Sequence, residues 1–269
     1  MNRDQSRTSS INNNNASKMS SVIRAKNFDV SKVVHDKIKP KGKGKMVKMN
    51  TGGSMIRLQL PIAKVPFGLS TYEDDKTGIK KYSMEISLGG STELEEFREQ
   101  LADLDDLNVN IIVSNCKAWI GEDKTKEVVE GALYGSLIKP DKKGESPPRF
   151  KMKLPVWEGK PMFTVYGNDK KQINTYDLVD GVPVLNWDWA QNGMEIKVIV
   201  ECEGLWVVNK NIYCTWRAVS IKVTKKSNRI TEYSFEDDDE DDDKGSDGSD
   251  GSEVDDEDEG SEVDESDNN

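Results

Sequence analysis

A row of cationic side chains on one predicted strand is the clearest chemical feature of the sequence. Residues 149–154 alternate cationic and apolar residues, so Arg149, Lys151 and Lys153 should share one face of the strand. Residues two apart on a strand are ~6.6 Å apart, which roughly matches the phosphate spacing of an extended single-stranded nucleic acid. Two further lysines lie in the predicted loop just before this strand: Lys142 and Lys143. The pattern favours binding of a polyanion, with an ordinary solvated strand face as the alternative.

The last predicted strand, residues 212–223, combines an aromatic side chain with cations. Its alternation places Tyr213 and Arg217 on the outward face, and Lys210 precedes it. Proteins that bind single strands use exposed rings, on which bases stack, beside cations that contact the phosphates. Of the six tryptophans, Trp157 is predicted to be exposed because its Pro-Val-Trp-Glu-Gly context is turn-like, whereas most of the others should be core residues. A Tyr213 half-buried against a loop is an equally open interpretation.

The sequence does not indicate catalytic or metal chemistry. His35 is the only histidine, and Cys116, Cys202 and Cys214 are scattered without a paired spacing. This nearly excludes a His–Cys zinc site and a Ser-His-Asp triad with a choice of base, and no phosphate-binding glycine loop leads into a helix. We therefore expect a protein that is not an enzyme, that uses no metal or cofactor, and whose thiols are buried and reduced.

Charge divides the chain into a basic body and an acidic tail. From Glu236 onward there are 20 acidic residues and one lysine, a net charge of −19, whereas the rest of the chain carries +8. A basic excess of this kind indicates a nucleic-acid partner. It is concentrated near the N-terminus, where residues 37–48 alternate lysine with turn-forming residues. The acidic run also fits another class, an acidic-tailed protein-interaction or histone-chaperone-like module.

The elements that must position these residues are predicted to be mainly β. Residues 55–60 and 82–88 alternate apolar and polar side chains, the signature of strands with one buried face. A helix is expected to begin at a Thr92–Glu95 capping box and to end at Asp105–Asp106. Further strands are predicted over residues 109–113, 128–138, 150–154, 162–166, 196–202 and 212–223. Many short strands and one helix indicate a closed or nearly closed barrel crossed by a single helix.

The domain organisation follows from composition. Residues 1–22 form a Ser/Asn-rich arm and residues 233–269 an acidic tail, neither of which has enough apolar surface to fold alone. Residues 23–232 are predicted to form the folded domain. The sequence contains neither an apolar run of membrane-spanning length nor an N-terminal signal peptide, so we expect a soluble intracellular protein without a membrane partner.

Several stretches together resemble a known family. They are residues 61–72, 81–88, the helix ending at 104–106, residues 147–155 and residues 216–222. They are similar to the OB-fold single-stranded DNA-binding proteins of nucleocytoplasmic large DNA viruses, which in turn resemble those of short-tailed phages. The resemblance covers roughly residues 23–225 and implies an OB-fold barrel with long insertions and a role in viral DNA replication, recombination and repair.

The resemblance also bears on partners and location. It implies single-stranded DNA as the ligand, and viral DNA polymerase, helicase or primase as candidate partners of the acidic tail. It places the protein in a host cytoplasmic viral factory or the host nucleus, and leaves a homodimer open. The phage family ends in an aromatic residue, whereas this chain ends Asp267-Asn-Asn269. We therefore expect the tail to act electrostatically, by covering the DNA-binding groove when no DNA is bound.

Overall fold

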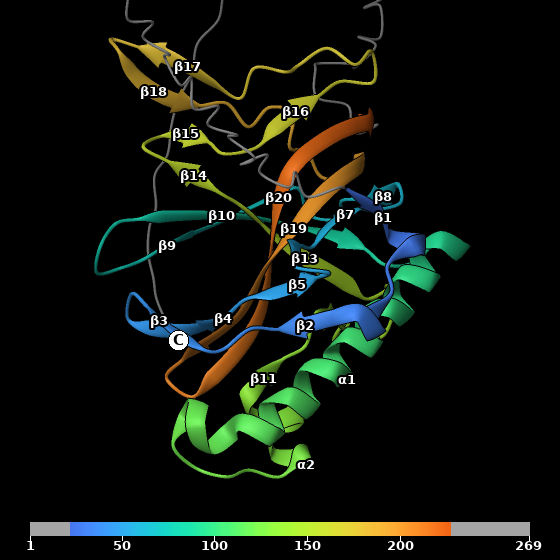
Figure 1. Ribbon diagram of the computed structural model, residues 1–269. Coiled ribbons are helices and arrows are strands. Elements are labelled where there is room, and N and C mark those ends of the chain that lie inside the picture. Colours follow the sequence, from blue (N-terminus) through green and yellow to red (C-terminus); the bar gives the residue numbers. More distant parts are fainter. Residues whose placement is uncertain (1–21, 227–269) are drawn as a thin grey trace, which may run out of the picture. The chain divides into compact units, whose positions relative to one another are not determined.

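The computed structural model describes residues 22–226, which build a mainly β fold with one long helix (Figure 1). The predicted acidic tail and all but the last residue of the predicted N-terminal arm lie outside the described residues. The mainly β, OB-like prediction is confirmed. None of the described helices is long and apolar enough to cross a membrane.

One large sheet dominates the fold, and a long antiparallel hairpin forms its centre. The strands along its main path are β1 (Ile23–Arg24), β7 (Arg57–Gln59), β19 (Glu195–Val208), β20 (Asn211–Lys225), β13 (Arg149–Leu154), β10 (Lys80–Ser87) and β9 (Leu69–Glu73). Others pair beside this path: β3 (Lys39–Lys41), β4 (Gly44–Val47), β8 (Ala63–Lys64), β11 (Tyr134–Gly135), β12 (Ile138–Lys139) and β16 (Thr164–Tyr166). Hydrogen bonding leaves β1 and β9 at the two ends of the path, so within residues 22–226 the strand ladder does not close into a full barrel.

Three small sheets and several short helical turns complete the structure. The small sheets are β2 (Val33–His35) with β5 (Met49–Thr51) and β6 (Ser54–Met55), β14 (Val156–Trp157) with β15 (Lys160–Pro161), and β17 (Tyr176–Val179) with β18 (Val182–Leu185). The helical elements are η1 (Ala25–Asn27), η2 (Val30–Lys32), α1 (Thr92–Ile120), α2 (Lys126–Val128) and the π-helical turn η3 (Val129–Leu133).

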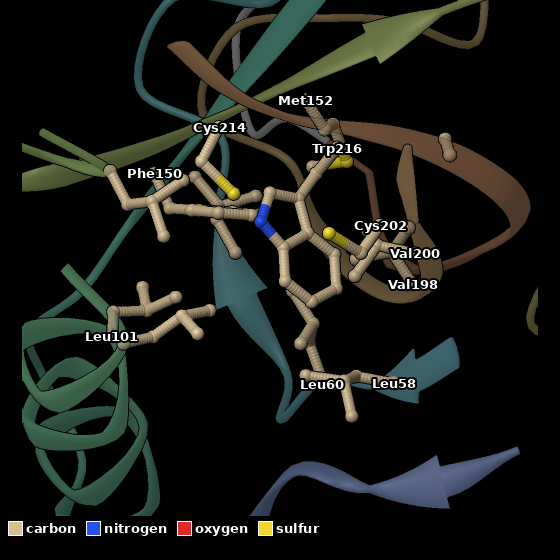
Figure 2. Close-up of a cluster of buried hydrophobic side chains, with 14 of the residues drawn as sticks. Leu58, Leu60, Leu101, Phe150, Met152, Val198, Val200, Cys202, Cys214 and Trp216 are labelled. Atoms are coloured by element: carbon tan, nitrogen blue, oxygen red, sulfur yellow. The ribbon is translucent and has the colours of Figure 1, made fainter. Parts of the chain in front are cut away.

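The core lies between the sheet and α1, and Trp216 lies within it. Figure 2 shows this ring surrounded by side chains from several strands. The Phe150 ring packs edge-on against Trp216, with centroids 6.0 Å apart, and against Phe97 of α1 at 5.8 Å. This chain of rings attaches the helix to the sheet, and replacing such a buried ring by Ala typically costs ~3–5 kcal/mol. The predicted inward faces of β13 and β20 are confirmed by the burial of their alternate residues.

The helix α1 is much longer than predicted, and its cap is one residue earlier. Ser91 is the N-cap, because its hydroxyl accepts a hydrogen bond from the Leu94 amide at 3.3 Å. The helix passes through the expected end and reaches Ile120, where Gly121 ends it with a φ of 91°. The strand predicted over residues 109–113 is therefore wrong. Its β-branched residues favour a strand, but Val109, Ile112 and Cys116 recur at helical spacing and are buried on one face of α1.

The strand predicted over residues 128–138 is also mostly wrong. Its first half forms the helical turns α2 and η3, and only the short strands β11 and β12 remain. The Asp105 carboxylate anchors this segment, since it accepts hydrogen bonds from the hydroxyls of Tyr134 and Ser136, both at 2.6 Å. Asp105 is thus an acceptor within the helix and not the helix end. Smaller corrections concern boundaries: β16 begins at Thr164, and β19 and β20 extend beyond their predicted ranges.

Candidate nucleic-acid interface

The outward face of β13 carries the predicted row of cations. The side chains of Lys151 and Lys153 are exposed, and that of Arg149 is mostly covered. The antiparallel register pairs Lys151 with Glu85 and Lys153 with Ser83 on β10, while the parallel pairing on the other side places Lys153 beside Arg217 of β20. The sheet therefore brings the cationic faces of β13 and β20 side by side, although the two strands are far apart in the sequence.

Carboxylates from other strands of the sheet neutralise part of this row. The Arg149 Nε atom lies 2.9 Å from Glu85 Oε2, and Lys153 Nζ lies 2.7 Å from Glu203 Oε2. No acidic residue lies between these cations along β13 itself, as the sequence indicates. In the folded protein, however, acidic side chains from other strands contact them. Within residues 22–226 no carboxylate forms an ion pair with Lys151. Ion pairs of partly exposed lysines contribute ~0–1 kcal/mol, so a phosphate can compete for Lys153.

A buried carboxylate holds two arginines at the junction of β7, β19 and β20. The Glu201 side chain is only 2% exposed, and it accepts hydrogen bonds from Arg57 Nε at 2.6 Å and from Arg217 Nε at 2.9 Å. The side chains of the two arginines remain 33% and 31% exposed. This triad carries a net positive charge, and its arginines are fixed in place while keeping donors at the surface.

Trp206 is the functional candidate that sequence reasoning missed. The register pairs it with Tyr213 on β20, and the buried neighbours Leu205 and Val207 show that its ring faces outward. Two ammonium groups lie against the ring: Lys41 Nζ at 5.0 Å and Lys153 Nζ at 5.6 Å from the centroid. The sequence feature that could have revealed Trp206 is Gly204. The pairing register of β19 shifts there, which changes which of the following side chains face outward. A side chain there would overlap the Val47 carbonyl oxygen, so the bulge depends on glycine.

Tyr213 is exposed on the same face of the hairpin, as predicted. Its ring lies against the backbone of Gly135 on β11, where a Cβ atom would come within 2.7 Å of the ring. Any side chain at position 135 would therefore collide with the tyrosine ring. Arg217, Lys153, Trp206 and Tyr213 form what we call the hairpin platform, together with Lys41 from the β3–β4 hairpin.

The remaining predicted residues do not contribute to the Trp206 contacts of this platform. Trp157 is 67% exposed on the separate β14–β15 hairpin, which confirms its predicted exposure. Lys142 and Lys143 are exposed in the loop between β12 and β13. Lys210 lies at the turn between β19 and β20, where its ammonium, 2.8 Å from Glu122, is the main cause that lowers the pKa of that carboxyl to about 2.

The three thiols lie in the core, and the single histidine is partly buried. The thiols of Cys116, Cys202 and Cys214 are buried and free. His35 Nε2 lies 2.8 Å from the Asn108 carbonyl oxygen, and burial lowers the pKa of this imidazole. Across residues 22–226 there is no cluster of three or more His, Cys, Asp or Glu side chains that could hold a metal ion.

Comparison with solved structures finds distant similarity. The single-stranded DNA-binding protein from bacteriophage Enc34, solved in complex with single-stranded DNA, is 9% identical with a TM-score of 0.39; the match covers 73% of this chain and 98% of that chain. The single-stranded DNA-binding protein gp2.5 of bacteriophage T7 is 10% identical with a TM-score of 0.39, over 67% of this chain and 98% of that chain. A comparison with curated protein sequences found no match. Residues 83–237, more than half of the chain, match the model of a family of unknown function, DUF5871, and the chain belongs to that family.

Proposed function

We propose that the protein binds single-stranded DNA, without reading its sequence, on the outward face of β13, β19 and β20. The observation that carries this proposal is the hairpin platform. There, the Trp206 ring lies beside the exposed Tyr213 and is contacted by the ammonium groups of Lys41 and Lys153. Aromatic faces beside cations are the combination that binds stacked bases and their phosphates without hydrogen-bond readout.

The energetics favour exchange of the lysines for a nucleotide. A cation–π contact at an exposed ring contributes ~0.5–1 kcal/mol, whereas a stacked base contributes ~1–3 kcal/mol. A base that lies on Trp206 can therefore displace the Lys41 ammonium, which is then free to contact the phosphate. The same reasoning applies to Lys153, whose ion pair with Glu203 is partly exposed.

The geometry favours single strands over duplex. Stacking on Trp206 and Tyr213 needs unpaired bases, whose flat faces are covered by their neighbours in a duplex. The platform is a sheet face, and none of its residues comes from a helix that could enter the major groove. The cations lie along β13 at a spacing that suits an extended backbone.

The wider role belongs to the same proposal. We propose that the protein supports replication, recombination and repair of a viral genome, in a viral factory or the host nucleus. Residues 23–232 would be the DNA-binding domain, and residues 233–269 would compete with DNA for the platform and recruit polymerase, helicase or primase. The support is the charge of −19 from Glu236 onward and the sequence resemblance to viral single-stranded DNA-binding proteins. A homodimer remains open to measurement.

Substitution of Trp206 tests the platform directly. Trp206→Ala should weaken binding of an oligo-dT by ~1–3 kcal/mol, whereas Trp206→Phe should retain most of the affinity because a ring remains. Affinity for a duplex of the same length should be weak in all three proteins. Fluorescence anisotropy of labelled oligonucleotides measures both, with circular dichroism to confirm folding. Equal loss in the two variants, or equal affinity for duplex and single strand, would contradict the proposal.

A further inference from the structure

A hollow lies at the other end of β13 from the hairpin platform. It has a volume of about 630 Å³, and its walls come from the segment after β8, the loop before β13 and the ends of β19 and β20. Arg149, the first residue of β13, lines it, whereas Lys153 near the end of the same strand contacts Trp206. The outward face of β13 therefore connects the two places.

An exposed aromatic ring forms one wall of this hollow. Phe67 is 60% exposed, although the chain around it is tightly held. The Val65 amide donates to the Met194 carbonyl at 2.8 Å, and the Gly193 amide donates to the Val65 carbonyl at 2.7 Å. Gly68, with a φ of 69°, packs so closely on residues 190–192 that a side chain there would be crowded. The ring is therefore held in place while its face stays open to solvent, as stacking of a base requires.

Cations surround this ring. The Arg149 guanidinium lies 5.2 Å from the Phe67 centroid and is held there by ion pairs with Glu85 at 2.9 Å and Asp141 at 3.5 Å. The other cations that line the hollow are Lys64, Lys225 and Lys226. One carboxylate, Glu195, lies among its lining residues, 4.0 Å from Lys225. Cations thus outnumber carboxylates among the lining residues, beside an accessible aromatic face.

We propose that this hollow is a second base-stacking subsite for the same DNA strand, with Phe67 as the ring and Lys225 and Lys226 as phosphate contacts. The inference rests on the proposed function. From Lys153 to Arg149, β13 covers ~13 Å, or about two steps of an extended strand at the spacing of alternate residues. A strand that leaves Trp206 along β13 therefore reaches Phe67, and the footprint must be long enough to include both rings.

A length series of oligo-dT tests the proposal. Wild-type affinity should rise with length over about 4 to 16 nucleotides, as the strand first fills the hairpin platform and then the hollow. Phe67→Ala should weaken binding of the longest oligomers by about 5- to 150-fold and leave the shortest unaffected. Leu178→Ala is the matched control, because Leu178 is 63% exposed on the β17–β18 hairpin and does not line the hollow.

A second variant probes the phosphate contacts by another measurement. The slope of log K against log salt is negative. Replacing Lys225 and Lys226 by Ala should make it less negative by ~1.4 for long oligomers, and leave it unchanged for short ones. If wild type shows the gain with length and both variants retain it, this subsite is wrong while the proposed function stands. If wild type binds no single-stranded DNA, the proposed function fails as well.

Discussion

The charge network around Glu201 gives a quantitative prediction about stability. Glu201→Gln keeps the shape of the side chain but removes the negative charge shared by Arg57 and Arg217. The guanidiniums then lie side by side without a counter-charge in a region where the glutamate is 2% exposed. Removing one partner of a buried ion pair typically costs ~3–5 kcal/mol. Because each arginine side chain is about one-third exposed to solvent, we expect a loss below this range, about 2–3 kcal/mol of the free energy of unfolding.

A neighbouring glutamate provides the control. Glu203 lies two residues further along β19, and its partner Lys153 is 48% exposed. Glu203→Gln should therefore lower the free energy of unfolding by less than about 1 kcal/mol. Urea denaturation followed by circular dichroism measures both, provided that the slopes of the transitions agree. Equal destabilisation by the two substitutions would refute the view that burial of Glu201 gives its ion pairs their strength.

A companion variant separates stability from function. Replacing Arg57, Glu201 and Arg217 together by apolar residues of similar size should be nearly neutral for stability, because no unpaired charge is left behind. The same variant should bind oligo-dT more weakly, since it loses the exposed donors of Arg217. Undiminished binding would show that the triad has no part in the interface.

Three further predictions concern pH, salt and the acidic tail. Burial lowers the pKa of His35 in the folded protein below its usual 6.5, so the unfolded chain binds more protons and stability should fall as the pH drops below 6.5. His35→Gln should reduce this acid sensitivity in thermal melts, and an unchanged pH dependence would contradict it. Replacing Lys151 and Lys153 together by Ala should make the slope of log K against log salt for oligo-dT less negative by ~1.4, and an unchanged slope would show that they do not contact the DNA. Deleting residues 236–269 should tighten oligo-dT binding most strongly at low salt, where the charge of −19 is least screened; unchanged affinity there would show that the tail does not compete with DNA.

Strand alternation was the part of the fold that sequence predicts well. On β13 and β20 the buried residues Phe150 and Trp216 and the exposed Tyr213 lie as expected, because one face of each strand must be apolar. The long helix was mispredicted, since Val109 and Ile112 are β-branched and favour a strand locally. Their burial against the core outweighs that preference.

The site was predictable only where its residues are close in sequence. The row on β13 could be found from local spacing, but Glu85 and Glu203, which neutralise part of it, come from strands far away in the chain. Trp206 was missed because a bulge at Gly204 resets which residues face outward, and no periodicity carries across it. Pairings of this kind depend on sheet register, which a single sequence does not specify.

The central claim is that an unpaired strand stacks on exposed aromatic rings of this protein. Titration of oligo-dT into the full-length protein, followed by tryptophan fluorescence, tests it most directly, because Trp206 is a half-buried residue of the hairpin platform and Trp157 is exposed. We expect a saturable change in tryptophan emission with oligo-dT and a much weaker change with duplex of equal length. In Trp206→Phe most of the emission change with oligo-dT should be lost. No change in emission with oligo-dT, or an equal response to duplex, would contradict it.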